Sequence, residues 1–234
     1  MAKRRRKDHS RRGKTYKRTK GNRPPGESIL IVCEGETEPI YFKELLYKLT
    51  GKHGLALVEI DSAKGGHTAV PDKAKRLQKK RKKECRRDAR KEPYHQIWCV
   101  FDTEAPNERN QFNAAKVMVE KCGFYMAASN PSFEFWYLLY VCYTTRSFAN
   151  AKELTTFLTN ELQKSFGTNI QNYHKTMNVL KELYEKKEQV IHYTEEAIKR
   201  AEKVLDNRLD PHDEYPNPST HIHKLVKILL DQYK

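Results

Sequence analysis

The chain has 234 residues and a formal net charge of +15, with 38% hydrophobic and 32% charged residues. This length suffices for one sizeable core, and no apolar run approaches the roughly 20 residues that a membrane helix needs. The charged N-terminus lacks the apolar stretch of a secretory signal, and the five cysteines form no CxxC pair, so we expect a cytoplasmic protein with reduced cysteines, no disulfide or zinc framework and no membrane association.

Positive charge is concentrated in two segments. Residues 1–23 hold twelve Lys or Arg and one Asp, a net charge of +11, and residues 73–91 hold twelve Lys or Arg and two acids, a net charge of +10. The rest of the chain is therefore mildly acidic, and the two clusters indicate a polyanionic partner, either DNA or RNA. The alternative is a solubilising tail and a solvated helix face. The candidate nucleic-acid-binding residues of the second cluster are Lys75, Arg76, Lys79, Lys80, Lys82, Lys83, Arg86 and Arg87.

The first part of the chain begins with residues 1–27, a basic arm for which we expect no fixed structure. A continuous apolar run predicts a buried strand at 29–33. A helix follows at 38–49, with Thr37 as its N-cap and Gly51 after its last turn.

The next elements alternate in the same way. Residues 55–61 are predicted to form a strand, 68–90 a long basic helix, 95–102 a strand, and 110–121 a helix. A fourth strand at 123–129 is followed by a buried helix at 132–143. This order predicts an α/β fold, a parallel sheet with helices on both faces, in which ligands bind beyond the carboxyl ends of the strands.

The pattern becomes helical after about residue 146. Apolar spacing predicts helices at 151–166, 176–191 and 193–209, and a last helix capped by Ser219 or Thr220. We therefore divide the chain into three parts, with the boundaries 1–27 for the arm, 28–145 for the α/β domain and 146–234 for a helical extension packed on that domain.

Acidic residues follow two of the predicted strands. Glu34 comes directly after the first strand, and Asp102 and Glu104 come at the end of the third. Residues i and i+2 of an extended chain point the same way, so the pair could aim two carboxylates at one point. Mg²⁺ is the natural ion between such oxygens where phosphate must also bind. The alternative is that these acids cap helices and pair with the abundant Lys and Arg.

The sequence around these acids resembles the TOPRIM domain of topoisomerases, bacterial primases and OLD-type nucleases, whose signature is Glu-Gly after the first strand and Asp-x-Asp after a later one. More narrowly, the chain resembles the RloB-like proteins, which are implicated in bacterial phage defence and are often encoded beside an ATPase partner. The motifs that carry the resemblance are "IVCEGETEPIYF", "WCVFDTE", "SNPSFEFWYLL", "NYHK" and "NPSTHIHKLV".

The resemblance implies Mg²⁺- or Mn²⁺-dependent nuclease chemistry. Glu34 matches the TOPRIM glutamate, a general acid/base or metal ligand, and Asp102 matches the first acid of Asp-x-Asp. Glu104 stands where a second Asp is usual, which lengthens that ligand by one methylene. Glu38 is a secondary metal ligand in this interpretation, and Lys175 in "NYHK" would neutralise the scissile phosphate.

Three further residues are secondary candidates. His67, in a Gly-Gly-His turn after the second strand, would contact phosphate or assist proton transfer, although a surface histidine is the commoner case. Asn130 and Glu134 could reach the site from the start of the helix after strand four, or belong to a simple helix cap.

Three functions are consistent with these features. The first is a metal-dependent nuclease acting on DNA or RNA in antiviral defence, working with an ATPase partner. The second is a non-catalytic nucleic-acid-binding subunit of a defence or restriction-associated complex, and the third is nucleotidyl transfer of the primase type. The sequence has no P-loop motif, so we expect no ATPase activity in this chain.

Overall fold

The computed structural model describes residues 26–53, 57–103, 109–168 and 171–233. Its centre is a five-stranded sheet in the order β2-β1-β3-β4-β5. Four strands are parallel: β1 (Ile29–Cys33), β2 (Val58–Ser62), β3 (Gln96–Asp102) and β4 (Tyr125–Asn130). The predicted fold class is confirmed, and this arrangement is compatible with a TOPRIM-like fold.

The first strand shows why the sheet has helices on both faces. All five residues of β1 are fully buried, because alternate side chains enter two different cores. Ile29, Ile31 and Cys33 join the larger core, whereas Leu30 and Val32 join the smaller one. A strand buried on both faces reads as a continuous apolar run, which is the pattern that the sequence shows.

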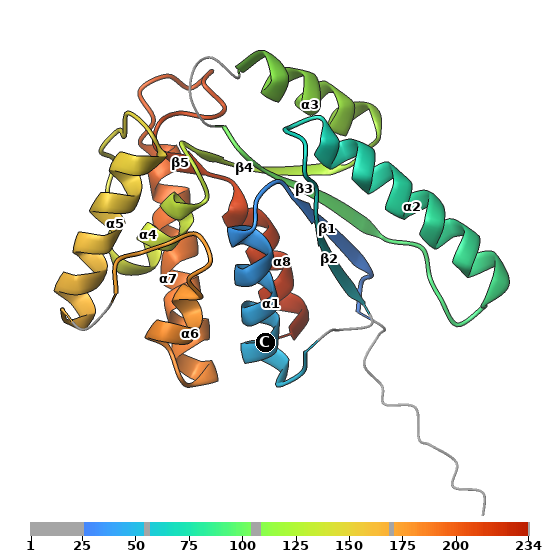
Figure 1. Ribbon diagram of the computed structural model, residues 1–234, viewed down its shortest axis with the longest axis horizontal. Helices are drawn as coiled ribbons and strands as arrows, with labels where there is room; N and C mark the ends of the chain where they lie inside the picture. The colour runs from blue at the N-terminus through green and yellow to red at the C-terminus, as the bar shows by residue number, and fades with distance from the viewer. Residues whose placement is uncertain (1–25, 54–56, 104–108, 169–170, 234) are drawn as a thin grey trace, which may run out of the picture.

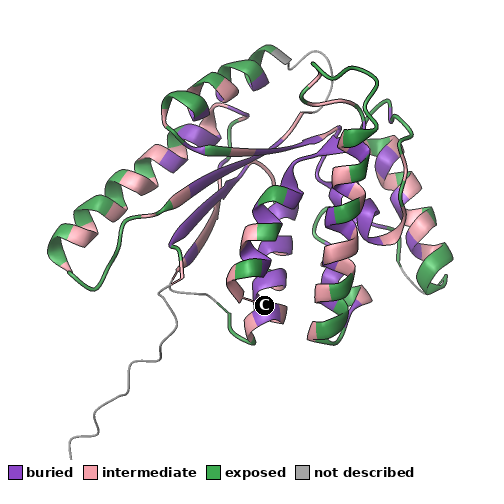
Figure 2. Cartoon of the chain, turned by 180° about the vertical axis from the view of Figure 1, so that it is seen from behind, coloured by how far each residue is buried: buried purple, intermediate pink, exposed green. Residues whose placement is uncertain are grey.

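The smaller core lies under two helices, α2 (Ala69–Arg87) and α3 (Arg109–Lys121). Only the first turns of α2 are buried, at Val70, Pro71 and Ala74. The rest of the helix extends away from the strands, on the right of Figure 1, and its residues are exposed or half-buried in Figure 2. This helix therefore presents a long free surface.

The larger core is covered by the remaining helices. Those before residue 170 are α1 (Thr37–Thr50), α4 (Glu134–Val141) and α5 (Ala151–Phe166). Those that follow are α6 (Val179–Leu183), α7 (Lys187–Asp206) and α8 (Ile222–Tyr233). The last helix packs beside α1, as Figure 1 shows, although they come from opposite ends of the chain.

The C-terminal part differs from its prediction in two places. The helix expected at 176–191 is instead the short α6, and α7 begins at Lys187. Tyr184 is extended, and its buried ring stacks on Tyr193 with ring centroids 4.6 Å apart, so burial of this side chain stops the first helix. Ser219 and Thr220 form β5, which pairs antiparallel with the end of β4. The hydroxyl oxygen of Thr220 also accepts the backbone N–H of Ile222, the first residue of α8, at 3.2 Å, so Thr220 caps the last helix as predicted.

The start of α1 also differs in detail from the expectation. Thr37 is the first helical residue, and its hydroxyl donates to the carbonyl oxygen of Lys175 at 3.0 Å instead of capping the helix.

Within the described residues, no helix is long and apolar enough to cross a membrane.

Candidate active site at the carboxyl edge of the sheet

Glu34 directly follows the last residue of β1 and still forms a backbone hydrogen bond with the neighbouring strand. Its backbone N–H donates to the carbonyl oxygen of Val100 on β3 at 3.1 Å. This bond fixes the residue against the neighbouring strand, while its side chain remains 20% exposed. Glu34 thus combines a rigid backbone with a side chain that is only partly exposed, because its Oε2 is buried and its Oε1 lies against His67.

His67 joins Glu34 to the end of β3. Gly65 and Gly66 before it have φ angles of 119° and 82°, a conformation that favours glycine, and this turn directs the imidazole inwards. Its Nε2 lies 2.9 Å from the carbonyl oxygen of Asp102, and its Nδ1 lies 3.3 Å from Oε1 of Glu34. A carbonyl only accepts, so Nε2 carries the proton of that bond. A single imidazole ring therefore separates Glu34 from the backbone of Asp102.

The burial of His67 was not evident from its sequence. The side chain is only 2% exposed, and its ring is parallel to that of Phe101 at 6.2 Å and edge-on to that of Phe112 at 5.9 Å. A histidine in a glycine-rich turn is more often a surface residue, and its contacts with β3 and α3 become visible only in the folded chain.

Asp102 holds the start of α4. Its Oδ1 accepts the backbone N–H of Phe133 at 2.8 Å, which ties the end of β3 to the segment that follows β4. The side chain is half-buried. Asp102 thus lies at the same sheet edge as Glu34, as the parallel topology requires, and has a structural contact there. Glu104, the third predicted acid, lies outside the described residues.

Glu38 lies beneath the turn that carries Glu34. It is 1% exposed, and its Oε1 accepts the backbone N–H of Gly35 at 3.2 Å. A Cβ at Gly35 would stand 2.6 Å from Oε2 of Glu38, so the glycine is needed for this close approach. Burial raises the pKa of the Glu38 carboxyl to about 7, and the charges of Glu134 and Glu34 add to the rise.

Glu134 is a second buried carboxylate on the same side. Its two oxygens accept hydrogen bonds from the hydroxyls of Ser132 at 2.5 Å and Tyr173 at 2.9 Å. Tyr173 was not among the predicted site residues, although it stands in the "NYHK" motif. These bonds connect the start of α4 with the segment between α5 and α6.

Lys175 is brought near the acidic edge by its backbone. Its carbonyl oxygen accepts the hydroxyl proton of Thr37, three residues after Glu34, and its side chain is exposed. Asn130 is further along the edge, where its Nδ2 donates to the carbonyl oxygen of Tyr215 at 2.8 Å. The edge therefore collects residues from both halves of the chain.

The donor set has the chemistry of a hard-cation site. Glu34 and Asp102 supply carboxylate oxygens at one edge, and Mg²⁺ is commonly held by one or two carboxylates together with substrate phosphates. Across the described ranges, however, no group of three or more His, Cys, Asp or Glu side chains is arranged to hold a metal ion. The assignment of Glu34, Asp102, Glu104 and Glu38 as ligands stays a prediction.

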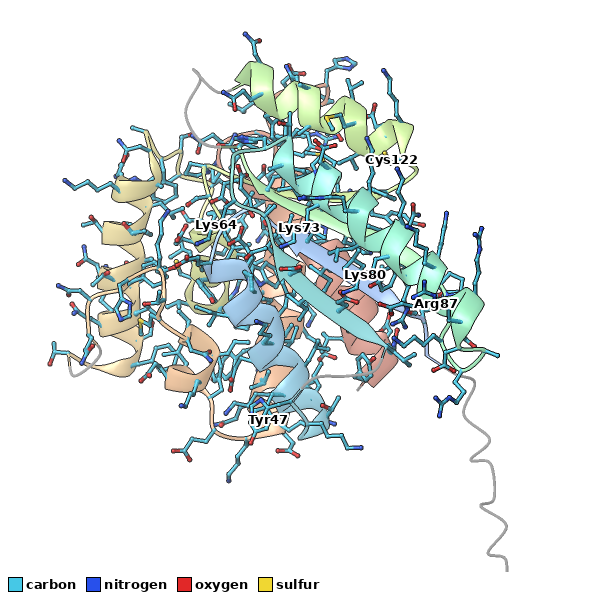
Figure 3. All side chains as sticks on the ribbon, turned by 45° about the vertical axis from the view of Figure 1, so that its right-hand side comes forward. Tyr47, Lys64, Lys73, Lys80, Arg87 and Cys122 are labelled. Atoms are coloured by element: carbon cyan, nitrogen blue, oxygen red, sulfur yellow. The ribbon has the colours of Figure 1, made fainter. Side chains whose placement is uncertain are left out.

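The second basic segment forms the outer surface of α2. Figure 3 shows Lys73, Lys80 and Arg87 spaced along it. Lys73 pairs with Asp61 of β2 at 2.8 Å, and Lys75 lies 3.9 Å from Asp72. Seven of the eight predicted nucleic-acid-binding residues are exposed and form no ion pair within the described part of the chain. These seven are Arg76, Lys79, Lys80, Lys82, Lys83, Arg86 and Arg87.

The chain matches one family of known proteins along most of its length. The model of the RloB-like proteins matches residues 29–229, which is most of the sequence and nearly all of the described fold. The chain belongs to the RloB-like family. Neither the curated proteins nor the solved structures include a match to it. The RloB-like match begins at β1 and ends within α8, so it includes the acidic edge, α2 and the β5 strand.

Proposed function

We propose that this RloB-like protein is a metal-dependent nuclease that hydrolyses phosphodiester bonds of DNA or RNA in bacterial antiviral defence, in the cytoplasm. The observation that supports this most directly is the contact of Glu34 with His67, and of His67 with Asp102, at the carboxyl edge of the sheet. This is the edge at which parallel α/β sheets bind their ligands.

Each residue has a stated part in this proposal. Glu34 would take a proton from an attacking water that reaches its partly exposed side chain. The imidazole of His67, whose Nδ1 lies 3.3 Å from Oε1, would hold the carboxylate from the buried side when both ring nitrogens carry protons. Glu34 and Asp102, with Glu104 by sequence, would hold Mg²⁺ or Mn²⁺. Such an ion, when bound, supplies positive charge to the phosphate oxygens and lowers the pKa of bound water.

The remaining groups hold the substrate or the site. Lys175 would face the phosphate from the segment that Thr37 anchors. Glu38 and Glu134 hold the turn and that segment from below, by their bonds to Gly35 and Tyr173. The exposed cations of α2 bind the phosphate backbone, because an acidic edge by itself repels it. The resemblance further suggests an ATPase partner that controls the nuclease.

The second candidate is a non-catalytic nucleic-acid-binding subunit. It is favoured because Asp102 and Glu38 already accept hydrogen bonds within the protein, from the backbone N–H groups of Phe133 and Gly35 respectively. In this case the acidic edge is structural, and only the basic surface of α2 functions.

A cleavage assay separates the two candidates. Purified full-length protein is incubated with duplex DNA, single-stranded DNA, tRNA and unstructured RNA, with Mg²⁺, with Mn²⁺, or with a chelator. A nuclease cleaves at least one substrate only when metal is present. Binding of all substrates without cleavage, alone or with any ATPase that is encoded beside it, would support the second candidate. Incorporation of labelled nucleotides would instead indicate primase-type transfer.

A further inference from the structure

A large cavity opens beside the acidic edge, on the side of β4. Its volume is about 700 Å³, within the range of roughly 300–1,000 Å³ that small-molecule sites occupy. Thr103, directly after β3, and Asn130, at the end of β4, form its floor. The cavity is thus also at the carboxyl ends of the parallel strands, one residue beyond Asp102.

Three separate segments complete the walls. They are α3, the first turn of α5, and the loop 212–217 that leads into β5. Figure 1 shows the loop between α7 and β5 at the same end of the sheet as the start of α3. Asn130 donates to the backbone of this loop, and Asn217 bonds the backbone of Phe148 through both its oxygen and its nitrogen. The cavity walls are therefore held in place without a ligand.

The lining combines aromatic rings with amides. Phe112, Phe148 and Tyr215 contribute rings, with Phe112 and Tyr215 edge-on at 5.2 Å. Phe112 and Phe148 are buried, so the half-buried Tyr215 is the ring of this set that a ligand can reach. Asn113 and Asn130 add side-chain amides, which can both donate and accept hydrogen bonds. Rings that pack against a flat heterocycle and amides that bond its edge are the usual means of holding a nucleobase.

Two lysines, Lys116 and Lys152, and two carboxylates, Asp213 and Glu214, line the cavity. Lys152 is exposed on the first turn of α5 and has no ion pair among the described residues. At the start of α5 the N–H of Glu153 is already bonded by Oδ1 of Asn150, so the lysine supplies the binding group at this end of the helix. Lys116, across the cavity on α3, is paired with Glu214 and lies 5.5 Å from the ring centroid of Tyr215. A phosphate group at this rim would meet Lys152 and, by competition with Glu214, Lys116.

We infer that this cavity binds one nucleotide unit, its base against the ring of Tyr215 and the amides and its phosphate at Lys152 and Lys116. The biological role of this site rests on the proposed nuclease function. A nucleotide that is turned out of the substrate strand into this cavity would place the next phosphate beside Asp102 and Glu34. Base recognition here would give the enzyme a sequence or structure preference that the phosphate contacts of α2 cannot supply.

The test measures binding directly and needs no cleavage. The four nucleoside 5′-monophosphates and inorganic phosphate are titrated into the full-length protein by calorimetry. We expect at least one monophosphate to bind clearly more tightly than phosphate alone. The double variant K116A/K152A should weaken its affinity about tenfold or more, because it removes charged hydrogen-bond donors. The matched control K121A/K164A removes two exposed lysines from the same two helices and should leave the affinity unchanged.

A second variant blocks the cavity without removing charge. Asn113 is exposed on α3, so Asn113→Trp can fill the space with little strain on the fold, which an unchanged melting temperature would verify. Monophosphate binding should be lost in this variant. Equal affinity in N113W, K116A/K152A and the parent overturns the inference, as does monophosphate binding no tighter than that of phosphate. Cleavage by the parent with no monophosphate binding overturns the nucleotide site alone, whereas cavity binding without any cleavage overturns the nuclease proposal alone.

Discussion

The acidic edge and the basic helix α2 carry opposite charges and are built in opposite ways. Three acids of the edge are held by contacts: Glu34 has His67, Asp102 has the backbone of Phe133, and Glu38 has that of Gly35 in the preceding turn. On α2, the seven exposed cations named above have no ion-pair partner within the described residues. One region is fixed by contacts, and the other is free to meet a partner.

The two regions are suited to different tasks: the acidic edge to catalysis, and α2 to binding of the substrate. A reacting carboxylate must be held in a defined position, and neighbours such as His67 provide this. Attraction to a phosphate backbone needs only charge density, because it comes from the release of counterions and is insensitive to side-chain geometry. We therefore expect substitutions at the edge to change rates, and substitutions on α2 to change binding.

The largest effect is expected for Glu34→Gln. The substitution keeps the shape but removes the proton acceptor, so cleavage should fall by about 10²–10⁴-fold with nucleic-acid binding retained. Single-turnover cleavage and a filter-binding assay measure the two quantities. The matched control is Glu36→Gln, the same change at an exposed residue of the same turn, which should cleave like the parent. Equal cleavage by E34Q and the parent would remove Glu34 from the chemistry.

A smaller effect, on binding alone, is expected when Lys79, Lys80, Lys82 and Lys83 are replaced by Gln. The slope of log affinity against log salt should flatten by about 0.9 per lost contact on duplex DNA, or about 0.7 on single strands. Cleavage at saturating substrate and the melting temperature should not change, since these side chains are exposed. A control variant loses four exposed lysines elsewhere, at 52, 164, 181 and 199. If the slope of log affinity against log salt flattens equally in both variants, α2 is not a dedicated binding surface.

Removal of the basic arm, residues 3–23, tests the other cluster. Its deletion should flatten the salt slope and weaken binding of all sequences alike, while cleavage at saturating substrate stays near that of the parent. Combined with the α2 variant, the losses in log affinity should add. An unchanged salt slope would mean that the arm is a bystander or serves a protein partner.

The smallest effect concerns the dependence of the fold on pH. Burial lowers the pKa of His221 to about 4, and Lys224 and His223 add to the shift, against Glu214. The histidine is therefore neutral in the folded state. Its contribution to the free energy of unfolding is fully present above about pH 6.5 and is lost as the pH falls towards 4. The loss should be about 2 kcal/mol, measured by urea denaturation at pH 7 and pH 4.5.

His221→Phe is the control for this prediction. It keeps a ring against Tyr215, whose centroid is 5.0 Å from that of His221, but it cannot be protonated. Stability of the variant should fall less with acid than that of the parent. The lysines and arginines of α2 stay charged throughout this range. Acid should therefore lower the free energy of unfolding, on which the acidic edge depends, without changing the charge of α2. Parallel pH curves for parent and variant would exclude His221 as the source.

The sequence by itself determined the parts that depend on local patterns. The apolar run at 29–33, the helical spacing at 38–49 and the charge density of 73–87 correspond to β1, α1 and α2. Parallel topology then placed Glu34 and Asp102 at one edge, because the carboxyl ends of neighbouring parallel strands coincide. The resemblance to RloB-like proteins also came from the sequence and was confirmed.

Tertiary structure alone decided the contacts between distant residues. Thr37 bonds the backbone of Lys175 across 138 positions of sequence, and Ser219 and Thr220 become a strand only because the end of β4 is open to pair with them. The burial of His67 and the raised pKa of Glu38 likewise depend on what packs over them, and the cavity beside β4 is lined by segments that are far apart in the sequence. Periodicity reports which face of an element is apolar, but not which other element covers that face.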